Sequence, residues 1–289
     1  MKIKQLADRF GSNRINAEKP GTLLKGCTCI NIPFAGGMCE VPFIIPYSKG
    51  GDPKSVGTAN IVNVNDLDRH VINLANVLAK PEMAKLLVQQ LEAVPFHPDV
   101  LLTCQKRCRA RENETYSQPK SAYEEIEWAL DYFVCSWMAR GGSGGTDKEF
   151  EQAMSIRWKS GGGDSAVRFR SATASLAGWQ KVMRLCTFTT MDAFDFLAEC
   201  MKRDIPENGI YVDAPWPEDG DNYKHKFGVG QQRLLADVLA AFEQTRIVVR
   251  YGDHPLIREL YPAPKWTWHD VSGRTQANSV KSEVLLTNY

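Results

Sequence analysis

One short segment constrains the fold more than any other, because it joins strand-forming residues to an abrupt stop. It reads Gly209-Ile-Tyr-Val-Asp-Ala-Pro-Trp-Pro217. The Ile-Tyr-Val run favours a β-strand, and the two prolines end it because proline cannot donate to a strand ladder. Asp213 is therefore expected at the carboxyl end of a strand. In an open α/β sheet this is the edge where ligands bind.

Further apolar runs typical of strands recur at both ends of the chain. We expect strands at residues 28–32, 59–64, 187–189, 209–213, 246–251, 266–271 and 283–288. Apolar residues at helical spacing lie between several of them, at 66–78, 231–242 and 254–260. This alternation predicts an α/β fold with a mostly parallel, twisted sheet, which the last two strands close as an antiparallel hairpin.

The middle of the chain breaks the alternation. It holds a helix-like stretch at 123–138 and a glycine-rich loop at 141–145. Residues 155–170 resemble two short strands around a glycine turn. We therefore predict two parts: residues 1–79 and 177–289 form the sheet domain, and residues 80–176 form a smaller insertion.

Composition excludes several classes of protein. The chain has 289 residues, 43% hydrophobic and 24% charged, which suits a full α/β core plus one insertion. No window reaches the roughly 18 apolar residues of a membrane span, and the first residues lack the apolar core of a signal peptide. A cytoplasmic protein with free thiols is expected, either a monomer or a weak dimer. The cysteines lack Cys-x-x-Cys spacing, so no metal is expected.

A glycine pair follows the first predicted strand, in Cys29-Ile-Asn-Ile-Pro-Phe-Ala-Gly-Gly-Met-Cys39. Gly36 and Gly37 would let the backbone turn tightly and approach a ligand with no side chain in the way. Alone, the pair is also typical of an ordinary strand-to-helix turn. Its order in the chain, before the Asp213 segment, favours a nucleotide-binding site.

Together these segments resemble the Dam-type adenine-N6 DNA methyltransferases. Pro33-Phe-Ala-Gly-Gly37 resembles the family's cofactor loop, and Asp213-Ala-Pro-Trp216 is similar to its catalytic Asp-Pro-Pro-aromatic tetrapeptide. Weaker similarities follow in the family's order. Phe10-Gly-Ser-Asn-Arg14 resembles its phenylalanine-glycine motif, and Asn63-Val-Asn65 and Thr189-Thr-Met-Asp192 stand where the family has acids after its second and third strands. The segments that resemble its closing blocks are Lys226-Phe-Gly228, 231–239, 246–261 and 283–289.

The resemblance implies a Rossmann-like sheet of the S-adenosylmethionine-dependent methyltransferase type, with an inserted target-recognition domain. It implies transfer of a methyl group from S-adenosylmethionine to the exocyclic N6 amine of adenine in duplex DNA. It leaves open the target sequence, and whether the setting is restriction, phage protection or regulation. The cofactor-binding residues that it implies are Phe10, Gly11, Asn13, Arg14, Pro33, Phe34, Ala35, Gly36, Gly37, Asn63, Asn65 and Asp192.

The implied catalytic residues are Asp213, Ala214, Pro215 and Trp216. An adenine amine is a poor nucleophile because its lone pair is delocalised into the ring. The Asp213 carboxylate would accept one N–H, and the main-chain carbonyl of Ala214 the other. Trp216 would stack on the flipped base, which contributes about 1–3 kcal/mol against an unpairing cost of a few kcal/mol. Contacts to the DNA backbone must therefore favour flipping.

Two positions depart from the family pattern. Ile32 stands where the family has an acid before the proline-phenylalanine pair, so the ammonium end of the donor would need another partner. The nearest in sequence are Glu40, Asn31 and Asp66. Asn63 stands for the acid after the second strand, although it can still accept a hydrogen bond. Two alternatives stay open: a catalytically inactive DNA-binding relative, and an enzyme of the same scaffold with a modified donor or an RNA substrate.

The insertion is where this family carries target recognition, with double-stranded DNA as the partner. From Ser155 to Arg184 inclusive there are six Lys or Arg and one acid. That local excess matters more than the net charge of +1, because a duplex senses the face presented to it. A solvated basic surface is the alternative. The predicted nucleic-acid-binding residues are Arg107, Arg109, Arg111, Arg140, Arg157, Lys159, Arg168 and Arg170.

Overall fold

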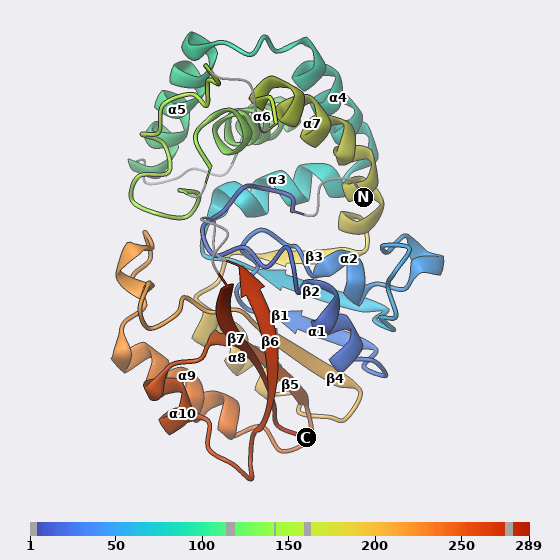
Figure 1. Cartoon of the computed structure of the whole chain (residues 1–289). Helices are drawn as coiled ribbons and strands as arrows, with labels where there is room; N and C mark the ends of the chain where they lie inside the picture. The colour runs from blue at the N-terminus through green and yellow to red at the C-terminus, as the bar shows by residue number, and fades with distance from the viewer. Residues whose placement is uncertain (1–4, 114–118, 142, 159–162, 275–279) are drawn as a thin grey trace. The chain divides into compact units, whose positions relative to one another are not determined.

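The computed structural model describes residues 5–113, 119–141, 143–158, 163–274 and 280–289 (Figure 1). The chain forms two compact units. The helical unit comprises Met1–Ser12 and Asp68–Arg184, and the sheet unit comprises Asn13–Leu67 and Leu185–Tyr289. The predicted division at residues 79 and 80 lies after helix α3 (Arg69–Ala79), whereas the division between these units lies before it.

The sheet unit contains a seven-stranded sheet in the order β3-β2-β1-β4-β5-β7-β6. The first five strands run parallel, and β7 runs antiparallel to both β5 and β6. This confirms the predicted α/β fold and its antiparallel closing pair, and it is compatible with a Rossmann-like fold. The strands are β1 (Cys29–Ile32), β2 (Ile61–Asn65), β3 (Cys186–Thr189), β4 (Asn208–Val212), β5 (Arg246–Gly252), β6 (Thr267–Arg274) and β7 (Val280–Thr287).

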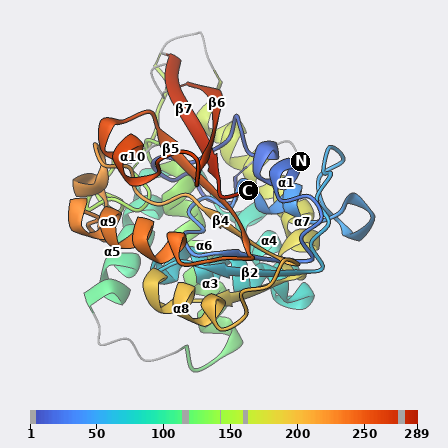
Figure 2. The same ribbon diagram turned by 90° about the horizontal axis from the view of Figure 1, so that it is seen from below.

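Helices lie on both sides of this sheet. Figures 1 and 2 show α1 and α2 on one side, and α8, α9 and α10 on the other. Side chains define several helix starts: Asp192 caps α8, and Gln231 accepts a hydrogen bond from the Gly228 amide before α9. The helices are α1 (Glu18–Leu23), α2 (Val41–Ile44), α8 (Ala193–Met201), α9 (Val229–Ala240) and α10 (Pro255–Leu260), with short 3-10 turns at Tyr47–Lys49 and Gly220–Asn222.

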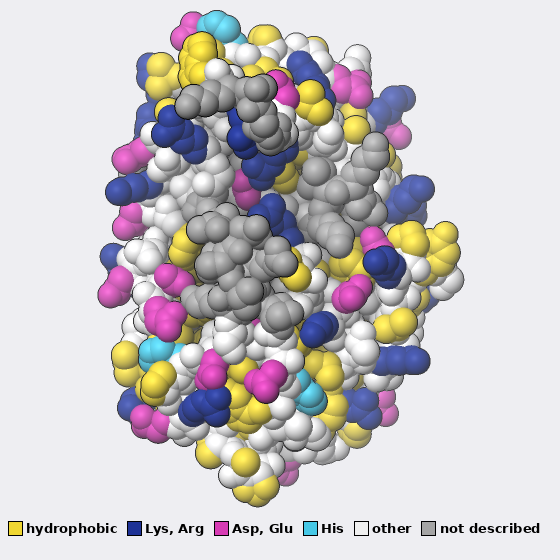
Figure 3. Space-filling view, viewed as in Figure 1, with side chains coloured by type: hydrophobic (Ala, Val, Ile, Leu, Met, Phe, Trp, Pro, Cys, Tyr) yellow, Lys and Arg dark blue, Asp and Glu magenta, His cyan; other side chains and the backbone are white. Residues whose placement is uncertain are grey.

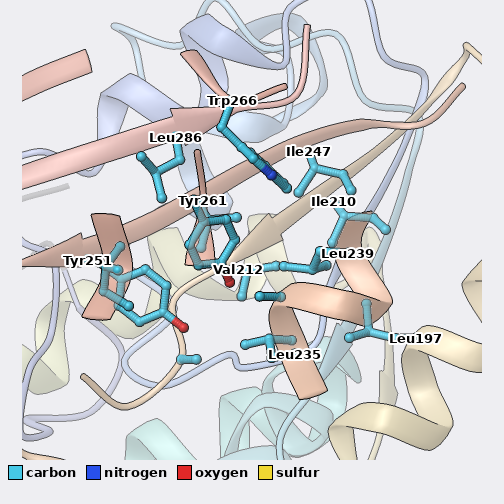
Figure 4. Packing of buried hydrophobic residues seen from close by; sticks show 14 of the residues in the cluster. Leu197, Ile210, Val212, Leu235, Leu239, Ile247, Tyr251, Tyr261, Trp266 and Leu286 are labelled. Atoms are coloured by element: carbon cyan, nitrogen blue, oxygen red, sulfur yellow. The ribbon is translucent and has the colours of Figure 1, made fainter. Parts of the chain in front are cut away.

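The core of the sheet unit fixes the position of the β4 end. Ile210 and Val212 of β4 are fully buried among side chains of β5, β7, α8 and α9, as Figure 4 shows. Burial of each such side chain contributes about 1.5–3 kcal/mol. Because Val212 is buried in this core, the residue after it, Asp213, is held at the sheet edge.

The helical unit is built around α6 (Ala122–Met138), which packs against α3, α4 (Pro81–Ala93), α5 (Pro98–Asn113) and α7 (Ser165–Met183). α6 buries side chains around most of its circumference, including Trp128, Tyr132, Phe133 and Trp137, as expected for a central helix. The Trp128 indole donates to Nδ1 of His70 at 2.7 Å, so a core histidine is held within the unit. No helix in the described ranges is long and apolar enough to cross a membrane.

The predicted hairpin at residues 155–170 is wrong. Asp164 caps a helix that begins at Ser165, with its carboxylate accepting from the Val167 amide at 3.0 Å. The helix buries one face at helical spacing: Phe169, Ala172, Thr173, Leu176, Trp179, Val182 and Met183. A window that stops at residue 170 contains only the first of these residues, so the helical period is hidden.

Candidate functional site

The four predicted catalytic residues form a turn directly after β4. Asp213 is 18% exposed at its side chain, and Ala214 is buried. Helix α9 holds the turn, because Gln232 donates its side-chain amide to the Pro215 carbonyl at 2.6 Å. Gln232 also accepts from the Tyr251 hydroxyl at 2.6 Å. The turn is thus fixed to both α9 and β5.

Arg250 of β5 bonds the Asp213 carboxylate. Its Nη1 lies 3.2 Å and 3.0 Å from the two carboxylate oxygens, while its Nε and Nη2 donate to Oε2 of Glu283 at 3.2 Å and 3.0 Å. The arginine side chain is only 5% exposed. Burial raises the pKa of Asp213, and the Arg250 charge opposes that rise. The buried guanidinium therefore favours the ionised form of this carboxyl group against the effect of burial.

The same guanidinium faces the Trp216 ring. Its central carbon lies 5.0 Å from the ring centroid, within the range of a cation–π interaction. A hydrogen bond from Trp216 also lowers the pKa of Asp213. Asp213, Trp216 and Arg250 thus hold one another.

A second buried carboxyl group, Glu40, lies near this group. It accepts a hydrogen bond from the Tyr211 hydroxyl at 3.1 Å, and that hydroxyl lies 3.4 Å from the Asn13 amide. Burial and the charge of Asp213 raise the pKa of Glu40 to about 8. Glu40 is therefore mostly protonated at neutral pH.

The predicted cofactor loop follows β1 and presents bare backbone. Gly36 has φ of 49°, and a Cβ built there would meet nothing within 4 Å. Its amide donates to Oδ2 of Asp66 at 2.8 Å, and the Ala35 amide donates to the Asn65 carbonyl at 2.9 Å. The loop is held by the end of β2, with open space above its glycine.

Asn63 and Asn65 make bonds between strands. Asn63 lies in the middle of β2 and donates to Oδ1 of Asn31 at 2.8 Å. Asn65 is fully buried, and its side chain bonds Pro33, Thr189 and Met191 at 2.7 to 3.1 Å. β2 ends at Asn65, and the residue that follows it is the acid Asp66, three residues after Asn63, to which the sequence pattern gave that place.

The other predicted cofactor residues are distributed unevenly. Asp192 accepts from the Phe194 amide at 2.8 Å as the cap of α8, and the Phe34 ring packs edge-on against Phe227 at 5.6 Å. Phe10 and Gly11 belong to the helical unit, where the Phe10 amide donates to the Gly144 carbonyl at 3.0 Å. Of the cofactor residues in the sheet unit, Pro33, Ala35 and Gly37 are buried in the loop, and Arg14 is exposed.

Five of the predicted DNA-binding arginines have partners within the helical unit. Arg107 and Arg111 pair with Glu127 and Asp131, and Arg168 pairs with Asp8 at 2.7 Å. The other two bond carbonyls, Arg109 that of Phe150 and Arg170 those of Leu91, Glu92 and Val94. Arg140 and Arg157 are exposed, and Lys159 lies outside the described residues. On the face in Figure 3, Lys and Arg are interspersed with Asp and Glu.

Sequence reasoning gave no role to Arg250, Glu283 or Gln232. A signal for the first two exists in the sequence, since each is a charged residue next to an apolar strand run, Ile-Val-Val before Arg250 and Val-Leu-Leu after Glu283. Such charges are almost never buried without a partner. The described residues contain no group of three or more His, Cys, Asp or Glu placed to hold a metal ion.

No family model matches this chain, and no curated protein matches it.

Proposed function

We propose that this protein is an S-adenosylmethionine-dependent DNA methyltransferase that acts on the N6 amine of adenine in duplex DNA by base flipping. One observation carries the proposal: the glycine loop and the Asp213 turn follow adjacent parallel strands, β1 and β4. A ligand in the crevice at this edge of the sheet would contact both. The parallel sheet with an antiparallel closing pair agrees with the fold implied by the resemblance.

Asp213 and the Ala214 carbonyl each offer an acceptor for one hydrogen of an amine. A carboxylate offers about four lone-pair positions, and Arg250 and Trp216 use up to three of those on Asp213. One remains for an amine hydrogen. Among the described residues, none donates a hydrogen bond to the Ala214 carbonyl. Two hydrogens of one amine would thus find two acceptors from consecutive residues.

The residues around the loop fit the proposed donor. S-adenosylmethionine, when bound, supplies an electrophilic methyl group beside a positively charged sulfur. Gly36 leaves open space for a close backbone approach, and Asp66 is an acid at the end of β2 that can accept from hydroxyl groups of a ribose. Ile32 is buried in the sheet, so its position offers no contact for an ammonium group. Of the two acids nearest in sequence, Asp66 would take this role, because Glu40 is mostly protonated at neutral pH.

A second function is favoured by one specific observation. Arg250 bonds both oxygens of Asp213 and so occupies part of their capacity to accept from an amine. This would suit a relative that binds DNA without turnover. Such a protein would bind duplex DNA specifically and bind the methyl donor weakly or not at all.

Methyl transfer tests the proposal directly. The protein is incubated with labelled S-adenosylmethionine and unmethylated duplex DNA of mixed sequence, and the nucleosides are analysed by mass. We expect a methyl group on adenine from the wild-type protein. Duplex binding without any transfer would favour the inactive relative. Transfer to RNA in a parallel incubation, with none to DNA, would favour the other substrate class.

A further inference from the structure

We infer that Arg250 is a positioning residue of this site, which fixes the Asp213 carboxylate and the Trp216 ring in the geometry that receives the flipped base. The inference rests on the proposed function and adds a residue to it.

The arginine is anchored on the side away from Asp213. Its Nε and Nη2 edge binds Oε2 of Glu283, which also accepts from the Asn16 side chain at 3.3 Å. Glu283 and Arg250 lie on the paired strands β7 and β5. A guanidinium held along one edge by a buried carboxylate has little freedom to swing. Its Nη1 end is directed at Asp213.

End-on contact is suited to orientation rather than to blocking. Nη1 bonds both oxygens of Asp213 and fixes the plane of the carboxylate, yet a lone-pair position remains for the base. A side-on, two-nitrogen contact would have used both oxygens more completely. The carboxylate is therefore oriented and still able to accept.

Trp216 is fixed by the same group. The guanidinium lies over one face of the ring at 5.0 Å and so occupies that face. Stacking on a preordered ring avoids the entropy cost of ordering the ring during flipping. Lysine cannot replace this function, because it lacks the planar fork and the stacking surface.

Arg250 also controls the charge state of Asp213. Besides Arg250, several titratable groups interact electrostatically with Asp213, and none of them is basic. They are the carboxyls of Glu40 and Glu283, the phenols of Tyr211 and Tyr251, and the thiol of Cys39. The Arg250 charge opposes them. Without the Arg250 charge, the pKa of Asp213 would be higher, so its carboxyl would stay protonated up to a higher pH and would not accept from the amine over that range.

Two variants test the inference. Arg250→Lys keeps a positive charge and loses the fork, while the double variant Arg250→Met with Glu283→Gln removes the cation without leaving Glu283 as an unpaired buried carboxylate. We expect Arg250→Lys to lower kcat by about tenfold or more, with donor and duplex affinities within about twofold. In the double variant, the acid limb of the pH profile of kcat should move to higher pH by about one unit or more. In Arg250→Lys, which keeps the positive charge, the acid limb should stay near its wild-type pH.

The matched control is Arg233→Lys on α9, an exposed ion pair with Glu259, which should leave kcat and its pH profile unchanged. Unchanged kcat and an unchanged acid limb in folded Arg250 variants would overturn the inference.

A readout in the free protein separates this inference from the proposed function. Carboxyl-labelled aspartate is followed by NMR as pH is varied, with Asp213 assigned by the loss of its signal in Asp213→Asn. We expect the Asp213 pKa to rise in the double variant and to return toward the wild-type value in Arg250→Lys. If the wild-type protein transfers no methyl group, the proposed function fails, while this titration still decides whether Arg250 controls Asp213. An Asp213 pKa that does not respond to either variant would overturn that control.

Discussion

At the scale of single residues, the site depends on carboxyl groups that share one buried guanidinium. Asp213 and Glu283 both pair with Arg250, and Glu40 has a pKa of about 8. Two carboxyl groups thus share one buried guanidinium, and the Arg250 charge is what opposes the rise in the pKa of Asp213.

Removal of the Asp213 charge tests the catalytic turn. In Asp213→Asn the side chain keeps its size but loses the ionised acceptor, so the amine is no longer drawn toward it. We expect kcat to fall by about 10²–10³-fold, the effect typical of one lost electrostatic contact. Donor binding, measured by calorimetry, should be unchanged. Asp237→Asn on the exposed side of α9 is the control, and wild-type turnover in Asp213→Asn would exclude this carboxylate from the reaction.

Glu40 gives the fold a pH dependence with a defined sign. Its unfolded carboxyl titrates near 4.5 and its folded carboxyl near 8. Between these values the folded state holds a proton that the unfolded state has released, so this contribution to stability is lost as pH rises, by up to about 1.4 kcal/mol per pH unit. Urea unfolding should show this loss in the wild-type protein and not in Glu40→Gln.

The control for this comparison is Glu207→Gln, an exposed position. It should follow the wild-type pH dependence. A Glu40→Gln variant with the same slope as the wild-type protein would show that Glu40 is already ionised in the fold.

Some site residues were predictable and others were not, for a physical reason. Asp213 and Trp216 follow an apolar run and are bounded by prolines, so local sequence alone predicts their place at a strand end. The Arg250 contact joins residues 37 positions apart, and no local pattern shows which buried acid a buried arginine will meet. Asp66 was not predicted as the acid that follows β2, because β2 extends one residue beyond the expected end, to Asn65.

At the scale of elements, long strands and amphipathic helices were predicted well, and the helix of residues 165–183 was not. The expected strand at 246–251 and helix at 231–242 correspond to β5 and α9 within about two residues. For α7, three glycines before Asp164 suggested a turn between strands, while the capping carboxylate that starts the helix was not recognised. Capping chemistry, rather than β-propensity, decided that segment.

The loop between β1 and α2 provides a test of ligand approach. In Gly36→Ala, the new Cβ enters open space, where we propose that the donor lies, and the positive φ adds about 1–2 kcal/mol of strain. We expect donor affinity to fall by tenfold or more, about 1.4 kcal/mol, as measured by calorimetry on folded protein. Gly230→Ala, an exposed helical glycine with no atom near its Cβ, is the matched control. Undiminished donor binding in Gly36→Ala would place the donor elsewhere.

The link between α9 and the catalytic turn should have a measurable energy. Gln232→Leu leaves the Pro215 carbonyl and the Tyr251 hydroxyl without the partner that each now has at 2.6 Å. Each unsatisfied buried group costs about 1–3 kcal/mol, so for two groups we expect a loss of about 2–6 kcal/mol in urea unfolding. Combination with Tyr251→Phe should be less than additive, because both changes remove one shared bond. If the two losses of stability were fully additive, the hydrogen bond between Tyr251 and Gln232 would contribute nothing. The control is Gln244→Leu at an exposed position.

At the scale of the whole molecule, the charge that could reach DNA is smaller than the sequence suggested. Eight basic residues of the helical unit were predicted to bind DNA, and five of them bond acids or carbonyls of the same unit. The Arg168 guanidinium also stacks over Trp137 at 5.1 Å. Arg107, Arg168 and Arg170 are exposed despite these bonds, whereas Arg140 and Arg157 are exposed without such a side-chain bond among the described residues, which makes them the candidates for phosphate contact.

The salt dependence of duplex binding separates these two classes of arginine. In Arg140→Gln with Arg157→Gln, each lost phosphate contact should reduce the slope of log affinity against log salt by about 0.9, with stability unchanged. In Arg168→Gln with Arg170→Gln, the ion pair with Asp8 and the bonds to the end of α4 are lost, so thermal stability should fall. The slope of log affinity against log salt, measured on the folded double variant, should equal the wild-type slope. Fluorescence anisotropy across a salt series measures both slopes. A reduced slope in the second pair alone would mean that Arg168 and Arg170 leave their internal partners to bind phosphate, and that the helical unit rearranges on DNA.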